Sequence, residues 1–116
     1  MMALLQVCQW QLAVQPLDMR CGMDSMVARV VEAFGQAQVH VAYVFTNARR
    51  TRIKVLVNDG FGLWLCTRRL NSGGFVWPQG KDNCPHPGPI ELGPQQWQAL
   101  TLGLNWQQVN RSITVV

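Results

Sequence analysis

The chain has 116 residues, enough for one domain with a core of its own, and its length predicts a single domain over residues 1–116. Charged residues make up 14% of the chain against about 25% in a typical protein, yet the formal net charge is +4, which favours an anionic partner. No apolar run reaches the roughly 18 residues that a membrane span needs, and the start lacks the basic region of a signal peptide. We therefore expect a cytoplasmic protein with no membrane partner.

The first third of the chain predicts a strand and then a helix. Partial alternation over residues 4–14 indicates a strand, and Pro16 and Gly22 interrupt the pattern. An amphipathic helix follows, with Asp24 as its predicted N-cap and Gly35 as its predicted stop. Its apolar positions recur at three- and four-residue spacing: Met23, Met26, Val27, Val30, Val31 and Phe34.

The middle of the chain reads as an antiparallel meander of about four strands. Alternating side chains predict strands over residues 39–46, 51–57 and 63–70, and the segment "FVW" at residues 75–77 predicts a short last one. Turn residues at 58–62 and 71–74 separate the later strands. These strands make up most of the predicted sheet.

The last third predicts a loop and a closing helix. Four of the six prolines fall in residues 78–89, and a helix is expected from Pro94 to Leu102 with Gly103 after it. Residues 112–116 are a further candidate edge strand. The predicted class is α+β: a mostly antiparallel sheet of four to five strands, with one helix near each end packed against it.

Six of the ten basic residues lie in or beside the predicted hairpin. By period two, Arg52 and Lys54 share a face, and we expect Arg68 on the neighbouring strand to extend a basic stripe over a sheet whose other face is dry. Such a stripe suits the phosphates of a nucleic acid. A solvated sheet face without a ligand is the alternative reading of the same pattern. The candidate nucleic-acid-binding residues are Arg49, Arg50, Arg52, Lys54, Arg68 and Arg69.

The aromatic residues support a second hypothesis. Trp64, Trp77 and Trp97 are candidate anchors of a protein-interaction adaptor that makes no direct contact with DNA, because tryptophan is enriched at the energetic centres of interfaces. Trp64 and Trp77 also offer planar surface for base stacking, or simply belong to the core.

The chain contains no convincing catalytic set, and we predict neither a cofactor nor a metal site. Asp24 is better explained as a helix cap and Asp59 as a turn residue. Cys84 and His86 are metal-ligand residue types, but their spacing in a proline-rich loop is a weak signal, and the four cysteines contain no C-x-x-C pair. A metal-dependent hydrolase is the third and least favoured hypothesis.

Five segments in series resemble one family of proteins encoded by bacterial transposable elements. They are "LDMRCGMDSM", "YVFTNARRTRIKVL", "DGFGLWL", "RRLNSGGFVWP" and "QQWQALTLGLNW". The likeness spans about residues 4–106 and is to the TnpB or Orf2-like accessory protein of the insertion-sequence sixty-six (IS66) family.

The resemblance implies a non-enzymatic accessory role in DNA transposition, beside a separate and larger transposase that carries the nuclease chemistry. DNA and that transposase are the implied partners, and no catalytic residue is carried over. The chain departs from the family pattern at Cys21, Thr46, Asn58, Cys66 and Thr67. These departures leave a diverged, captured copy as an alternative to a working transposition factor.

Overall fold

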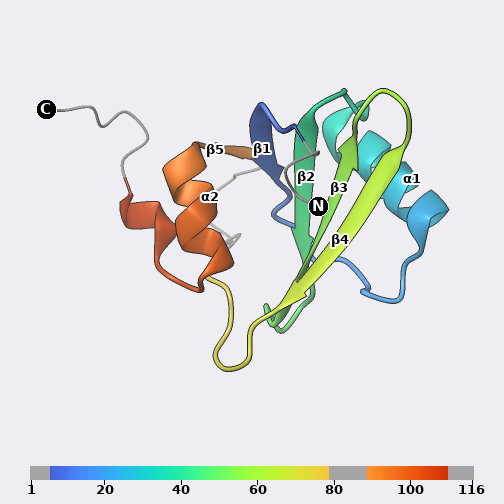
Figure 1. Ribbon diagram of the computed structural model, residues 1–116. Helices are drawn as coiled ribbons and strands as arrows, with labels where there is room; N and C mark the ends of the chain where they lie inside the picture. Colours follow the sequence, from blue (N-terminus) through green and yellow to red (C-terminus); the bar gives the residue numbers. More distant parts are fainter. Residues whose placement is uncertain (1–5, 79–88, 110–116) are drawn as a thin grey trace, which may run out of the picture.

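A five-stranded sheet with one helix on each face forms the framework of the protein (Figure 1). The computed structural model describes residues 6–78 and 89–109. In space the strands run in the order β4-β3-β2-β1-β5, so β4 and β5 are the two edges. The elements are β1 (Gln9–Leu12), α1 (Met23–Phe34), β2 (Val41–Thr46), β3 (Arg52–Asn58), β4 (Leu63–Arg69), β5 (Ile90–Leu92), α2 (Pro94–Thr101) and the short 3₁₀ helix η2 (Trp106–Gln108).

The predicted α+β class is confirmed, with one topological difference. Strands β2, β3 and β4 form the expected antiparallel meander. Strand β1 instead lies parallel to β2, and α1 makes the crossover between them. A parallel pair needs such a long connection, which here is the helix. Strand β5 was not predicted, and it pairs antiparallel with β1 at the far edge.

The sheet is covered on both faces, so the expectation of one wet and one dry face is wrong. Successive side chains of β2 point to opposite sides, and Tyr43 and Phe45 pack with Met26 and Val30 of α1. Val44 points the other way, into the cluster that contains Leu100 of α2. Every residue of β2 is consequently buried.

Helix α1 ends where the sequence predicts but begins two residues earlier than Asp24 suggests. The N-cap is Gly22, whose carbonyl accepts a hydrogen bond from the Met26 N–H at 2.9 Å. Asp24 lies inside the first turn, where a carboxylate favourably meets the positive end of the helix dipole. Its predicted capping role is therefore wrong. Gly35 follows the last turn with φ of 91°, a conformation that favours glycine.

The predicted last strand of the meander is wrong, because residues 75–77 are not in a strand. Side-chain hydrogen bonds instead link this segment to distant parts of the chain. The Trp77 indole donates to the Ala13 carbonyl at 2.9 Å, and the Trp106 indole donates to the Val76 carbonyl at 2.6 Å. Phe75 and Trp77 are buried beside α2, so this extended segment is part of the core.

The second helix agrees with its prediction to one residue, and its first turn is closed by Gln96, whose side-chain oxygen accepts from the Gly93 N–H at 2.9 Å. Within residues 6–78 and 89–109, no helix has the length and apolar character that crossing a membrane requires. Most of the proline-rich loop, with Cys84 and His86, and the candidate strand at residues 112–116 lie outside the described residues.

Candidate nucleic-acid interface

The register of the β3–β4 hairpin decides which basic side chains share a face. Arg52 lies directly opposite Arg69, and Lys54 lies opposite Thr67. Arg68 lies opposite Ile53, one position out of step. Because neighbouring positions point to opposite faces, Arg52, Lys54 and Arg69 project to the α1 side and Arg68 to the α2 side. The expected stripe that joins Arg52, Lys54 and Arg68 is therefore wrong.

Four arginines instead gather at one end of the sheet, where the β2–β3 turn meets the end of β4 (lower end of the sheet in Figure 1). We call Arg49, Arg50, Arg52 and Arg69 the arginine cluster. Arg50 is half-buried and the other three are exposed. Among the described residues, the ion pairs join Arg20 to Asp18 and Arg29 to Glu32, and none reaches the cluster. Like charges directly opposite each other destabilise a sheet, and Arg52 and Arg69 form such a pair.

The β2–β3 turn, which carries Arg49 and Arg50, is held by the side chain of Asn47. Its side-chain oxygen accepts from the backbone N–H groups of Thr51 at 2.9 Å and Arg52 at 3.2 Å. Its side-chain nitrogen donates to the Thr51 hydroxyl at 2.9 Å. Arg50 has φ of 62°, which non-glycine residues rarely adopt. Such local strain persists only where the surroundings hold it, and it is concentrated at functional sites.

The segment after β4 contacts the same turn through its backbone. The Phe75 N–H donates to the Arg50 carbonyl at 2.7 Å, and a Cβ at Gly74 would lie only 2.9 Å from that carbonyl oxygen. Glycine at position 74 is therefore what allows the two backbones to approach.

We expect Gly74→Ala to displace the Arg50 turn and to lower the free energy of unfolding by about 1–3 kcal/mol, because the added methyl overpacks a backbone contact. Thermal unfolding followed by circular dichroism measures the loss. Gly62→Ala is the matched control, since nothing lies within 4 Å of a Cβ at that position. Equal stability of the two variants would show that the turn does not depend on this contact.

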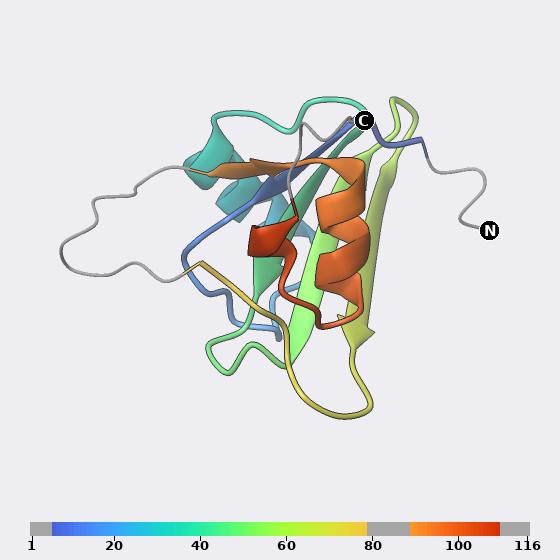
Figure 2. The same cartoon turned by 90° about the vertical axis from the view of Figure 1, so that its left-hand side faces the viewer.

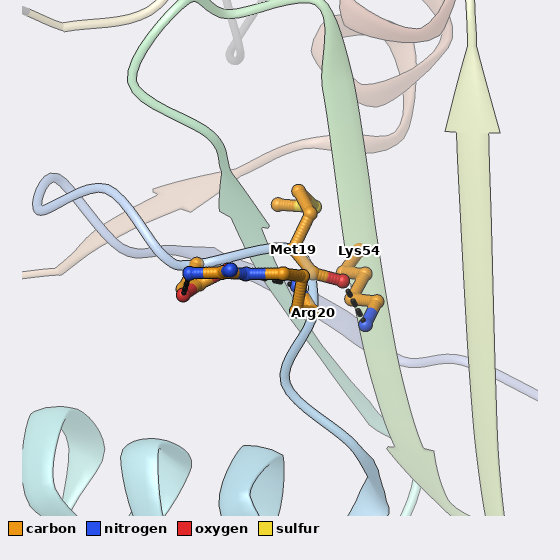
Figure 3. A network of polar contacts seen from close by, with 4 residues as sticks. Met19, Arg20 and Lys54 are labelled. Carbon is orange, nitrogen blue, oxygen red and sulfur yellow. Dashed lines mark hydrogen bonds and ion pairs between the residues drawn. The ribbon is translucent and has the colours of Figure 1, made fainter.

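Lys54 is not part of the surface that the arginines form. It is 9% exposed. Its ammonium donates to the Met19 carbonyl at 2.9 Å (Figure 3) and also to the Cys21 carbonyl at 2.6 Å. These bonds tie the loop before α1 to the middle of β3. Lys54, which the sequence pattern grouped with the phosphate contacts, therefore has a structural role in the fold.

Asp18 and Arg20, in the same loop, form a two-pronged ion pair. Both guanidinium contacts are short, with Nε to Oδ1 at 3.1 Å and Nη2 to Oδ2 at 2.9 Å, and the Arg20 N–H also donates to Oδ1 at 2.9 Å. The side-chain bonds of Arg20, followed by its backbone N–H, lower the pKa of Asp18 from 3.8 to about 2. The carboxylate thus stays ionised and paired throughout the physiological range.

Asp59 has a local role at the opposite end of the β3–β4 hairpin. It accepts from the backbone N–H groups of Phe61 and Gly62 and from the Trp64 indole, each at 2.8 Å. These bonds, that of Phe61 foremost, lower its pKa. Within the described part of the chain, no three His, Cys, Asp or Glu side chains gather as a metal site would require.

The α2 face carries a second surface, which sequence reasoning missed. A groove of about 630 Å³ lies between α2 and strands β3 and β4, with Trp10, Trp97 and Arg68 in its walls. The two indoles stack with ring centroids 6.2 Å apart, and the Arg68 Nε donates to the Thr101 carbonyl at 2.7 Å. No local pattern pairs Trp10 with a residue so far along the chain, so only the fold reveals this groove.

The three tryptophans of the adaptor hypothesis have different surroundings. Trp77 is 4% exposed and belongs to the core, so it is not an exposed anchor. Trp64 and Trp97 are half-buried. Of these two, only Trp97 lines the groove.

Comparison with known proteins agrees with the resemblance seen in the sequence. The family model described as IS66 Orf2 like protein matches residues 8–111. Two uncharacterised proteins of Sinorhizobium fredii (strain NBRC 101917 / NGR234) are similar to the chain. The protein y4jC is 35% identical over 100 residues, which cover 85% of this chain and 81% of the relative. The protein y4hO is 35% identical over 91 residues, which cover 78% and 75%.

No solved structure matches the chain significantly. The family match, by contrast, includes both helices, all five strands and the whole arginine cluster. This chain belongs to the IS66 Orf2-like protein family.

Proposed function

We propose that the protein is a non-enzymatic accessory factor of transposition that contacts DNA, or a transposase–DNA complex, through the arginine cluster. Family membership supports the transposition role. The observation that carries the contact is the gathering of four arginines on one rigid end of the sheet, with no described carboxylate paired to them. The nuclease chemistry belongs to the larger transposase in this proposal.

The geometry of the cluster suits phosphate oxygens better than base edges. Arg52 and Arg69 come from adjacent strands and Arg49 from the turn beside them, so the charges spread across a surface and do not line a pocket. Guanidinium groups bind phosphate oxygens with two parallel hydrogen bonds. Contacts of this kind fix a protein on DNA without reading its sequence. Lys54 has no direct contact in this proposal, and Arg68 lies on the other face.

Binding measured against salt tests the proposal. If four phosphates are contacted, the logarithm of the association constant falls with the logarithm of the salt concentration with a slope of about −3 to −4. Fluorescence anisotropy with labelled element-end DNA and with random duplex gives both the slope and the specificity. Binding that is insensitive to salt, or no binding at low salt, would contradict DNA contact.

The groove on the α2 face favours the adaptor as a second candidate function. Its walls combine aromatic and aliphatic side chains with one arginine, a composition typical of the centres of protein interfaces. Trp97→Ala separates the two functions, because it removes one wall of the groove and leaves the arginine cluster intact. If this variant no longer captures the element's transposase but binds DNA with unchanged affinity, the adaptor function is favoured.

A further inference from the structure

Strand β4 is a long, open edge of the sheet. It is the last strand in the spatial order and spans seven residues, Leu63–Arg69. Figure 2 shows it at the border of the molecule, and no described element lies beyond it. The other edge strand, β5, has only three residues. An unpaired edge of this length is a template for one more strand.

The hairpin register shows which backbone groups of β4 have no strand partner among the described residues. The Asp59 N–H donates to the Gly62 carbonyl at 3.1 Å and closes the turn. Hydrogen-bonded and non-bonded pairs alternate from there along an antiparallel ladder. By that alternation Trp64, Cys66 and Arg68 direct their backbone groups to β3. The N–H and C=O groups of the intervening residues, Leu65 and Thr67 at the centre, point outward from the edge.

We propose that β4 pairs antiparallel with β4 of a second copy of this chain, about a two-fold axis through Cys66. Cys66 is the middle residue of the strand, so this register pairs all seven residues. It places Leu65 opposite the partner's Thr67, and both have outward-pointing backbone groups. The two sheets then join into one continuous sheet.

The side chains of β4 are self-complementary in this register. On the α2 face, Arg68 lies opposite the partner's Trp64, an arrangement for a cation–π contact that the axis repeats. Both side chains are already oriented, Arg68 by the Thr101 carbonyl at 2.7 Å and Trp64 by the Asp59 carboxylate at 2.8 Å. On the α1 face, Arg69 lies opposite the partner's Leu63. No cation faces another cation, and this complementarity points to a second copy as the occupant.

A cysteine crosslink tests the register. The full-length chain with Cys8, Cys21 and Cys84 changed to serine keeps Cys66 alone, and copper phenanthroline serves as the oxidant. Cys66 occupies a non-hydrogen-bonded pair on the axis, where Cα atoms lie about 4.5 Å apart, within the range that a disulfide spans. We expect a covalent dimer on a non-reducing gel.

The matched control moves the thiol by one residue, adding Cys66→Ser and Thr67→Cys. The two position-67 residues are then diagonal neighbours about 7–8 Å apart, too far for a disulfide. We expect no crosslink in the control. Equal or faster crosslinking of the control would overturn the register.

The mass of the protein in solution tests whether the β4 edge forms a dimer. We expect the unmodified full-length chain to sediment as a dimer, and Thr67→Pro to weaken the dimer at least about tenfold by removing an outward N–H. Thr67→Ala keeps that N–H and should remain dimeric. A monomer at every concentration of the unmodified chain, or a dimer that a folded Thr67→Pro variant retains, would overturn the proposal.

Discussion

Changing Arg52 and Arg69 together to glutamine is expected to weaken DNA binding by on the order of 100-fold at low salt, since each loses a charge-assisted phosphate contact. The salt slope should fall by about 1.8, or about 0.9 for each phosphate contact removed. The free energy of unfolding should stay the same or rise slightly, because the variant relieves two like charges that lie directly opposite each other. Anisotropy titrations and denaturant unfolding measure the two effects.

The matched control removes the same charge elsewhere. Arg20 and Arg29 are paired with Asp18 and Glu32, so Arg20→Gln with Arg29→Gln lowers the net charge equally and leaves the cluster intact. We expect the control to bind DNA within a few fold of the unmodified protein. An equal loss in both double variants would mean that net charge, and not the cluster, attracts DNA.

The largest effect on stability is expected from Lys54→Met. The substitution keeps the alkyl chain but leaves the carbonyls of Met19 and Cys21 without their donor inside the protein. We expect the free energy of unfolding to fall by about 2–4 kcal/mol, because hydrogen bonds to a buried charged group are among the stronger ones. Chemical denaturation followed by tryptophan fluorescence measures the loss.

Arg52→Met is the control for this substitution, on the same strand and the same face. Arg52 is exposed, so its loss should change the free energy of unfolding by no more than about 0.5 kcal/mol while weakening DNA binding. The two variants should thus have opposite phenotypes. A Lys54→Met variant that folds as stably as the unmodified protein but no longer binds DNA would contradict the structural role and identify Lys54 as a phosphate contact.

Local patterns predicted the two α-helices and strands β2, β3 and β4 well, because these elements depend on neighbouring residues. Three- and four-residue spacing located α1, and glycine at position 35 marked its end. Alternation and the turn at residues 58–62 located β3 and β4. Residues 75–77 failed for the converse reason: their alternation resembles a strand, but their backbone bonds to distant segments, with the Phe75 N–H donating to the Arg50 carbonyl and the Val76 carbonyl accepting from the Trp106 indole.

The candidate site was harder to predict because its geometry depends on register and on distant contacts. Nothing in the sequence places Arg68 opposite Ile53, and a shift of one residue changes the face of the sheet. Lys54 resembles any solvent-facing lysine on a strand until its carbonyl partners, 33 and 35 positions away in the chain, are known. Nuclear magnetic resonance of the arginine side chains can test each arginine of the candidate site separately.

The central claim is that the arginine cluster is the DNA-contacting surface. The most direct test follows the arginine Nε–Hε signals of the ¹⁵N-labelled full-length chain as short duplex DNA is added, with assignments from single arginine-to-glutamine variants. We predict that the signals of Arg49, Arg52 and Arg69 shift together in proportion to bound DNA, while those of Arg20 and Arg29 stay in place. A complex that forms with the cluster signals unmoved would contradict the claim.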